Sequence, residues 1–135
     1  IWWTNVRPAG WEQFLALAQK NSGTGDTRYC ICETQQTSYT KNGDVLFSVM
    51  VGSRAEDHNL PPGLAGKMLH AGKYAVFTHQ GDFRKLYKTY QYIFGTWLPS
   101  VKEELDDRED FEQYERAVIS LDDPDNEVKI YIPIK

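Results

Sequence analysis

The residues of this sequence that are best suited to chemistry lie at 110–114, which read Asp-Phe-Glu-Gln-Tyr. Alternate side chains of a β-strand point to the same face of a sheet, so Glu112 and Tyr114 would share one face. A further phenol, Tyr131, lies in the last predicted strand. If these three side chains face the same space, they form a carboxylate surrounded by aromatic rings.

Such an acid has a defined chemical use. A carboxylate removed from water costs several kcal/mol unless a partner compensates its charge, and an organic cation compensates it directly. Surrounding rings add cation–π attraction of about 0.5–2 kcal/mol each. The same desolvation raises the pKa of a carboxyl, which also suits a general base. An exposed Glu112 on an edge strand is the structural alternative.

The sequence offers no other recognisable catalytic arrangement. His58, His70 and His79 lack metal-ligand spacing, and we predict that His70 and His79 are surface or hydrogen-bonded structural residues. A Gly-rich phosphate loop and a Gly-x-Ser-x-Gly motif are missing as well. Cys30 and Cys32 would share one strand face as buried, reduced thiols. We therefore expect no catalytic set, no metal and no cofactor.

The composition is that of one globular domain rich in aromatic residues. The 135 residues include four Trp, eight Tyr and six Phe, and the formal net charge is −4. No cluster of Lys or Arg resembles a nucleic-acid-binding surface, and no apolar stretch reaches the ~20 residues of a membrane span. We therefore expect a soluble, cytoplasmic protein that contacts neither nucleic acid nor a membrane directly.

Hydrophobic periodicity predicts an α+β fold with the same order of elements in each half. Helices are predicted at 11–20 and 83–97, and strands at 28–35, 44–51, 66–78, 110–118 and 127–134. This order predicts two strand-helix-strand-strand units within one domain, 1–135, with pseudo-repeats at 1–53 and 64–135. The opening strand of the first unit would be reduced to residues 1–3 or missing. Two antiparallel sheets would then form a central ligand cleft where the halves meet.

The second helix carries the strongest periodic signal. Asp82 is placed to cap it, Pro99 predicts a break or turn beyond it, and the acidic run 103–110 predicts a solvated connection. The apolar residues expected on one stripe are Phe83, Leu86, Tyr87, Tyr90, Ile93, Phe94 and Trp97. This stripe would cover the sheet.

Five sequence blocks follow one another in the second half. They are 60–63 (Leu-Pro-Pro-Gly), 71–81 (Ala-Gly-Lys-Tyr-Ala-Val-Phe-Thr-His-Gln-Gly), 95–99 (Gly-Thr-Trp-Leu-Pro), 110–114 (Asp-Phe-Glu-Gln-Tyr) and 128–135 (Val-Lys-Ile-Tyr-Ile-Pro-Ile-Lys). In order and spacing these blocks resemble the GyrI-like family, also known as the AraC-type effector-binding domain. The first half matches only through its helix and the strand 45–52. The resemblance implies a duplicated strand-helix-strand-strand fold with a central cleft, used by multidrug-responsive transcription regulators to sense lipophilic cations.

The resemblance also implies which residues form the site. Glu112 would lie at the floor of the cleft, with Trp97, Tyr114 and Tyr131 as aromatic walls. Phe47 would take a commonly aromatic pocket position in the first half. A non-enzymatic binder of lipophilic or aromatic cations is therefore the leading hypothesis.

Two other hypotheses stay open. Some GyrI-like proteins resemble hydrolases in which the cleft glutamate and a tyrosine promote attack of water on a strained electrophile, so an enzyme is one alternative. A gyrase-inhibitor-like interaction protein is the other. Since no helix-turn-helix is visible in the sequence, we expect a stand-alone domain, for which a homodimer and a separate regulatory protein partner are both open.

Overall fold

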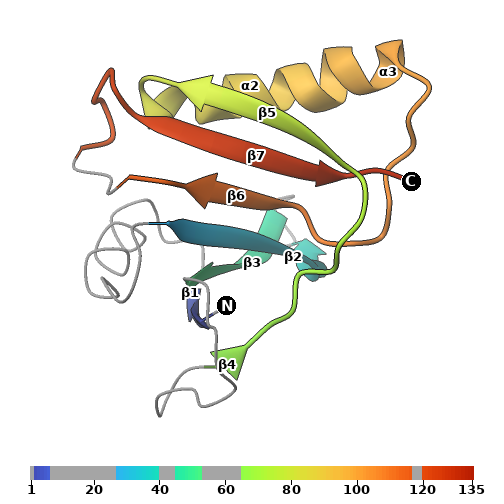
Figure 1. Ribbon diagram of the computed structural model, residues 1–135, viewed down its shortest axis with the longest axis horizontal. Coiled ribbons are helices and arrows are strands. Elements are labelled where there is room, and N and C mark those ends of the chain that lie inside the picture. The colour runs from blue at the N-terminus through green and yellow to red at the C-terminus, as the bar shows by residue number, and fades with distance from the viewer. Residues whose placement is uncertain (1, 7–26, 40–44, 53–64, 117–119) are drawn as a thin grey trace.

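The strands pair into one antiparallel sheet, and a helical segment covers part of one face (Figure 1). The structure is a computed structural model that describes residues 2–6, 27–39, 45–52, 65–116 and 120–135. Its strands are β1 (Trp2–Val6), β2 (Arg28–Tyr39), β3 (Val45–Gly52), β4 (Ala65–Gly66), β5 (Tyr74–Gln80), β6 (Phe111–Tyr114) and β7 (Glu127–Pro133). The α+β class predicted from the sequence is confirmed.

The order of strands in the sheet is β4-β1-β3-β2-β6-β7-β5. The expectation of two separate sheets is wrong for the described strands, because β2 and β6 pair with each other in the middle. Cys30 lies opposite Glu112 and Ile31 lies opposite Phe111 in this pairing. Pairing satisfies backbone donors and acceptors that two separate sheet edges would leave without partners.

The first half begins with a longer strand than the sequence suggested. β1 pairs with β3 through Thr4 opposite Val51 and Val6 opposite Val49, so the prediction of a reduced or missing opening strand is wrong. In the order β1-β3-β2-β6-β7-β5, the first half contributes its first, third and second strands. The second half then contributes its second, third and first strands, β6, β7 and β5. The helix predicted at 11–20 lies outside the described residues, so the duplication of whole units stays a prediction.

The helix of the second half begins at Asp82, as predicted. The Asp82 carboxylate accepts a hydrogen bond from the backbone N–H of Arg84 at 2.9 Å. A 3₁₀ turn, η1 (Phe83–Lys85), leads into α2 (Leu86–Tyr92), a π-helical turn η2 (Ile93–Trp97) and α3 (Leu98–Ser100). Pro99 does not end the helix before it, because it is the second residue of α3, which follows η2 without a break.

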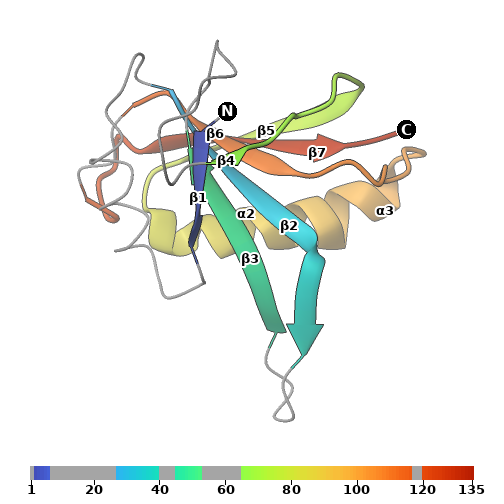
Figure 2. The same ribbon diagram turned by 90° about the horizontal axis from the view of Figure 1, so that it is seen from below.

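The helical segment lies along one face of the half of the sheet that contains β5 and β7 (Figure 2). The buried side chains between helix and sheet are Val51, Phe83, Leu86, Ile93, Tyr114, Val128, Ile130 and Ile132, with Tyr90 and Trp97 partly buried beside them. Tyr87 and Phe94, expected on the same stripe, are 56% and 42% exposed. Each lies one position, about 100°, from a buried residue, which places it at the edge of the apolar stripe.

A second apolar cluster covers the opposite face of the sheet. Its buried members are Ile31, Met50 and Phe111, and its partly buried members are Tyr29, Leu69, Tyr74 and Tyr131. The phenol of Tyr74 donates a hydrogen bond to the carbonyl oxygen of His70 at 2.8 Å. Each face of the sheet therefore carries its own apolar cluster.

His79 joins β5 to the start of the helix. Its Nδ1 lies 2.6 Å from the hydroxyl oxygen of Thr89, and its Nε2 lies 3.0 Å from the carbonyl oxygen of Asp82. The side chain is buried. The prediction of a hydrogen-bonded structural histidine is confirmed.

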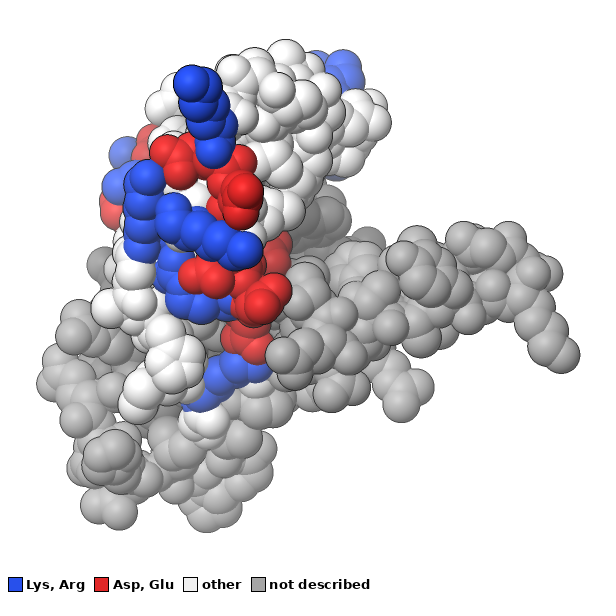
Figure 3. All heavy atoms as spheres, turned by 90° about the vertical axis from the view of Figure 1, so that its right-hand side faces the viewer, with Lys and Arg blue, Asp and Glu red and all other residues white. Residues whose placement is uncertain are grey.

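The acidic connection before β6 is held to the end of the sheet by ion pairs. Lys73 pairs with Glu103 at 2.9 Å, Lys135 pairs with Glu104 at 3.6 Å, and Lys67 pairs with Glu109. Figure 3 shows acidic and basic side chains interleaved on this end of the molecule. The exposed pairs of Lys73 and Lys135 each contribute little to stability, and a more buried contact lies beside them.

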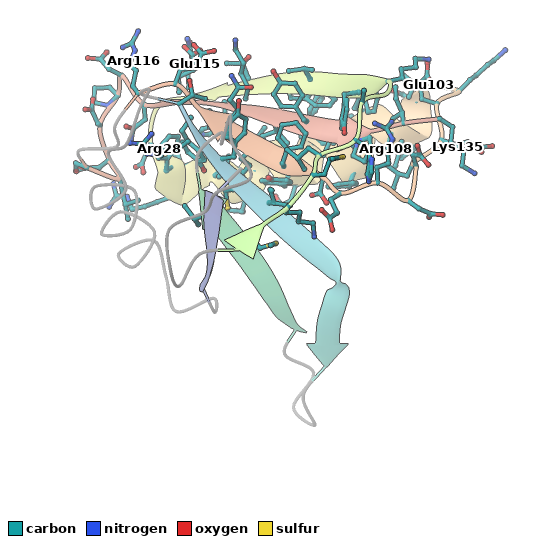
Figure 4. All side chains as sticks on the ribbon, turned by 60° about the horizontal axis from the view of Figure 1, so that its bottom comes forward. Arg28, Glu103, Arg108, Glu115, Arg116 and Lys135 are labelled. Atoms are coloured by element: carbon teal, nitrogen blue, oxygen red, sulfur yellow. The ribbon has the colours of Figure 1, made fainter. Side chains whose placement is uncertain are left out.

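Arg108 supplies this contact. Its guanidinium donates to Asp106 Oδ2 at 2.7 Å and to the carbonyl oxygens of Lys73 at 2.6 Å and Ile134 at 3.1 Å. It also lies over the Tyr74 ring, 4.4 Å from its centre. In Figure 4, Arg108 gathers with Glu103 and Lys135 at one end of the sheet, far from Arg28, Glu115 and Arg116 at the other.

The burial of the helix generates a paired prediction. Ile93→Ala should lower the free energy of unfolding by about 2–5 kcal/mol, because Ile93 is 0% exposed and its removal leaves a cavity. Phe94→Ala, one position along, should cost much less. Urea denaturation of both variants measures the difference, and equal losses would contradict the orientation of the helix.

Candidate ligand-binding site

Glu112 lies on the face of the sheet that the helix covers. It is the second residue of β6, and its register neighbours are Cys30 in β2 and Ile130 in β7. Ile130 belongs to the core between helix and sheet, so the Glu112 side chain points toward the same layer. Only 9% of Glu112 is exposed. The alternative of an exposed glutamate on an edge strand is therefore wrong.

Uncharged donors surround the carboxylate. The hydroxyl of Tyr114, two residues along β6, donates a hydrogen bond to Glu112 Oε2 at 3.3 Å. The side chains of Tyr90 from α2 and Cys30 from β2 also hydrogen-bond Glu112. Three elements thus bring one donor each to a single buried acid.

Burial raises the pKa of Glu112 to about 7. The hydrogen bonds from Tyr90, Tyr114 and Cys30 lower this pKa, and the nearby Asp110 carboxyl raises it, so the donors offset only part of the desolvation. None of these main influences is a cation. The carboxyl consequently exchanges its proton in the neutral pH range.

The phenols beside Glu112 keep their protons. Burial, and then the negative charge of Glu112, raise the pKa of Tyr90 and of Tyr114 well above the usual value for tyrosine. Burial also raises the pKa of Asp110. Tyr90 and Tyr114 therefore remain protonated hydrogen-bond donors in the neutral pH range.

The predicted aromatic residues lie in different places. Tyr114 contacts Glu112 directly, and Trp97 lies in the same layer, where its ring meets that of Phe77 edge-on with centroids 4.9 Å apart. Phe47 lies in β3, but its side chain is outside the described part of the structure.

Tyr131 is the exception among the predicted walls, because it lies on the opposite face of the sheet. β6 and β7 pair Phe111 with Tyr131, and the two rings stack with centroids 4.6 Å apart and planes 7° from parallel. Residues opposite each other in a sheet share a face, so Tyr131 shares a face with Phe111 and not with Glu112. The expectation that Tyr131 surrounds the acid together with Tyr114 is wrong.

Sequence reasoning missed two residues of the site, Tyr90 and Cys30. Tyr90 was assigned to the apolar stripe of the helix, and Cys30 to the buried thiols of a strand. Cys30 is a partly buried thiol. The only sequence signal was that each carries a donor group among apolar neighbours, and a buried donor requires a partner.

The surface also contains a shallow polar hollow on the other face of the sheet. Its lining consists of Gln113, Glu115, Arg116, Glu127 and Lys129. It has no aromatic wall, and charged side chains in it pair with each other, as Lys129 does with Glu115 at 3.1 Å. It is therefore unsuited to a lipophilic molecule.

The raised pKa of Glu112 makes stability depend on pH. Between the usual carboxyl pKa of 4.5 and about 7, the folded protein keeps a proton that the unfolded chain has lost, so the free energy of unfolding falls as pH rises through this window. Glu112→Gln cannot lose that proton, and at pH 8 it should be more stable than the native protein by on the order of 3 kcal/mol.

Urea denaturation from pH 5 to 8.5 measures this gap, which should narrow as the pH is lowered. Glu104→Gln is the matched control, because the Glu104 side chain is 76% exposed, and this variant should follow the native protein. Parallel stability profiles for Glu112→Gln and the native protein would contradict the buried, proton-binding carboxyl.

Comparisons with known proteins agree with the resemblance found in the sequence. A family model of the GyrI-like small molecule binding domain matches residues 4–135. The transcriptional regulator BrlR of Pseudomonas aeruginosa is 31% identical over 127 residues, which make up 92% of this chain and 44% of the regulator. This chain therefore spans less than half the length of that relative. Within the described residues, no helix has the length and apolar character needed to cross a bilayer. The chain belongs to the GyrI-like family of small-molecule-binding domains.

Proposed function

We propose that this domain binds lipophilic organic cations in the layer between helix and sheet, with Glu112 as the counter-charge. The observation that carries the proposal is a carboxyl that is 9% exposed and whose hydrogen-bond partners among the described residues, Tyr90, Tyr114 and Cys30, are uncharged. A cation placed beside Glu112 would supply the charge that these partners lack.

The aromatic residues of this layer support the choice of ligand class. Tyr90, Tyr114 and Trp97 all pack into the core that contains Glu112. Ring faces attract cations by about 0.5–2 kcal/mol each and also pack against flat apolar groups, without demanding one ligand shape. This supports recognition of several lipophilic cations, as in multidrug sensing. Phe47 stays a proposed pocket residue of the first half.

A sensing role is supported by the kind of relative that shares the domain. BrlR is a transcriptional regulator, and this chain aligns with 44% of it. We propose that the domain reports the presence of its ligand to a regulatory partner in the cytoplasm, and that its two halves, 1–53 and 64–135, are pseudo-repeats of one domain, 1–135. A homodimer would place two such sites in one particle.

A hydrolase is the second candidate. Burial raises the pKa of Glu112 to about 7, which suits a general base at neutral pH, and Tyr90 and Tyr114 could donate hydrogen bonds to a developing negative charge. If the protein hydrolyses a strained electrophile and Glu112→Gln abolishes this hydrolysis, the result would favour an enzyme over binding alone.

The binding proposal predicts discrimination by charge. Benzyltrimethylammonium should bind at least tenfold more tightly than neopentylbenzene, its neutral isostere, because only the cation compensates the Glu112 carboxylate. Calorimetric titration at pH 8 measures both affinities. Glu112→Gln should remove the preference and Glu104→Gln should retain it. Equal affinity for the two compounds would refute the role of Glu112.

The two faces of the sheet generate a second prediction. Trp97→Leu should weaken cation binding about 2- to 30-fold, the equivalent of one cation–π contact. Tyr131→Leu removes a ring of similar use from the opposite face and should leave the affinity unchanged. Titration of both folded variants with benzyltrimethylammonium provides the test. Weaker binding by Tyr131→Leu and unchanged binding by Trp97→Leu would place the site on the face of the sheet that carries Tyr131.

A further inference from the structure

We propose that the site exchanges ions: below neutral pH Glu112 holds a proton in the ligand-free domain, and an organic cation takes the place of that proton, which leaves to solvent. This inference rests on the proposed function and adds its regulation by pH. The carboxyl O–H bond is broken, the proton passes to water or buffer, and the positive charge of the ligand replaces it. Net charge within the site is therefore the same before and after binding.

The groups that face Glu112 come from every described element around it. β6 contributes the Tyr114 phenol and α2 contributes the Tyr90 phenol. β2 contributes the Cys30 thiol and, on the same face opposite Tyr114, the buried Arg28, which is not among the main influences on the Glu112 pKa. β7 contributes Ile130, which is fully buried and apolar. The carboxyl of Asp110, at the entry to β6, is the nearby titratable acid.

These surroundings favour the protonated acid over the carboxylate. A buried carboxylate is stabilised by hydrogen bonds but loses the solvation that water gave it, and three uncharged donors replace only part of that loss. The Asp110 carboxyl opposes a second negative charge two residues away. In agreement with this geometry, burial raises the pKa of Glu112 to about 7, so near neutral pH the acid is poised between its two forms.

A bound cation reverses the balance. A positive charge beside a carboxyl stabilises the ionised form, so Glu112 loses its proton when the cation is in place. Because the free protein must give up a proton first, cation affinity is reduced by the protonated fraction of Glu112. For a pKa of about 7, affinity for a fixed cation should be about tenfold weaker at pH 6 than at pH 8.

Neutral ligands should show the opposite dependence. A molecule with a hydrogen-bond acceptor, such as an aryl amide, can accept a hydrogen bond from the O–H of the neutral Glu112 carboxyl, but it cannot compensate a carboxylate. Its affinity should therefore fall as pH rises. The proton-binding state of one residue thus selects between two chemical classes of ligand.

Calorimetry measures the exchange directly. Benzyltrimethylammonium carries a fixed charge, so any proton released on binding comes from the protein. Titrations at the same pH in two buffers with different heats of ionisation give the number of protons released. We expect about 0.9 protons per cation at pH 6 and about 0.1 at pH 8.

Two variants test whether Glu112 is the source of the proton. Tyr114→Phe removes a donor that lowers the pKa of Glu112 and should shift the pH dependence of affinity to higher pH. Asp110→Asn removes a charge that raises this pKa and should shift it to lower pH. Glu104→Gln should shift neither. A general loss of stability would not shift the pH dependence of affinity in opposite directions in two folded variants.

The outcomes separate this inference from the binding proposal. Cation binding with no proton release and equal affinity at pH 6 and pH 8 would overturn ion exchange while leaving cation binding intact. No cation binding at any pH by the folded protein would overturn both. If either variant fails to fold, the proton count of the native protein decides the question alone.

Discussion

The backbone pairing of β2 with β6 is the constraint on which the site depends. It places Cys30 opposite Glu112 and joins the strands of the two halves into one sheet. Because opposite residues share a face, this register turns the carboxyl and the thiol toward the helix together. The helix then adds Tyr90 from above. The acid is buried because the sheet is continuous at this point, and a gap between two sheets would have left Glu112 in water.

Burial of the Glu112 carboxyl costs stability, and its hydrogen bonds offset only part of this cost. The donors Tyr90, Tyr114 and Cys30 lower the pKa of Glu112, yet burial still holds it at about 7. The main influences on its pKa include no lysine or arginine, whose charge would have compensated the carboxylate. The domain instead keeps an incompletely compensated acid, and residues retained against stability in this way are typical of functional sites.

The sequence predicted those features that depend on local order. The alternation of a strand was sufficient to place Glu112 and Tyr114 on one face, and Asp82 was sufficient to locate the start of the helix. Tyr131 was misplaced because its face depends on the register between β6 and β7, which no local pattern encodes.

Tyr90 and Cys30 were missed for a related reason. Each obeys the pattern of its own element, and only the packing of α2 and β2 around β6 makes them partners of Glu112. The prediction of two sheets was wrong for the same reason, because the periodicity of a strand does not show whether β2 and β6 pair with each other. Long-range pairing is thus the information that the local sequence did not contain.

The contacts of Arg108 affect the face of the sheet on which Glu112 lies. Its guanidinium is fixed to Lys73, to Ile134 and to Asp106 just before the chain enters β6, and it packs so closely over Gly72 that a Cβ there would lie 2.4 Å from Nη1. These contacts would all break if the chain slid along its neighbours at this point. A slip of one residue would turn Phe111 inward and Glu112 outward. Arg108, which lies outside the proposed site, thus helps to hold the register that turns Glu112 toward the helix.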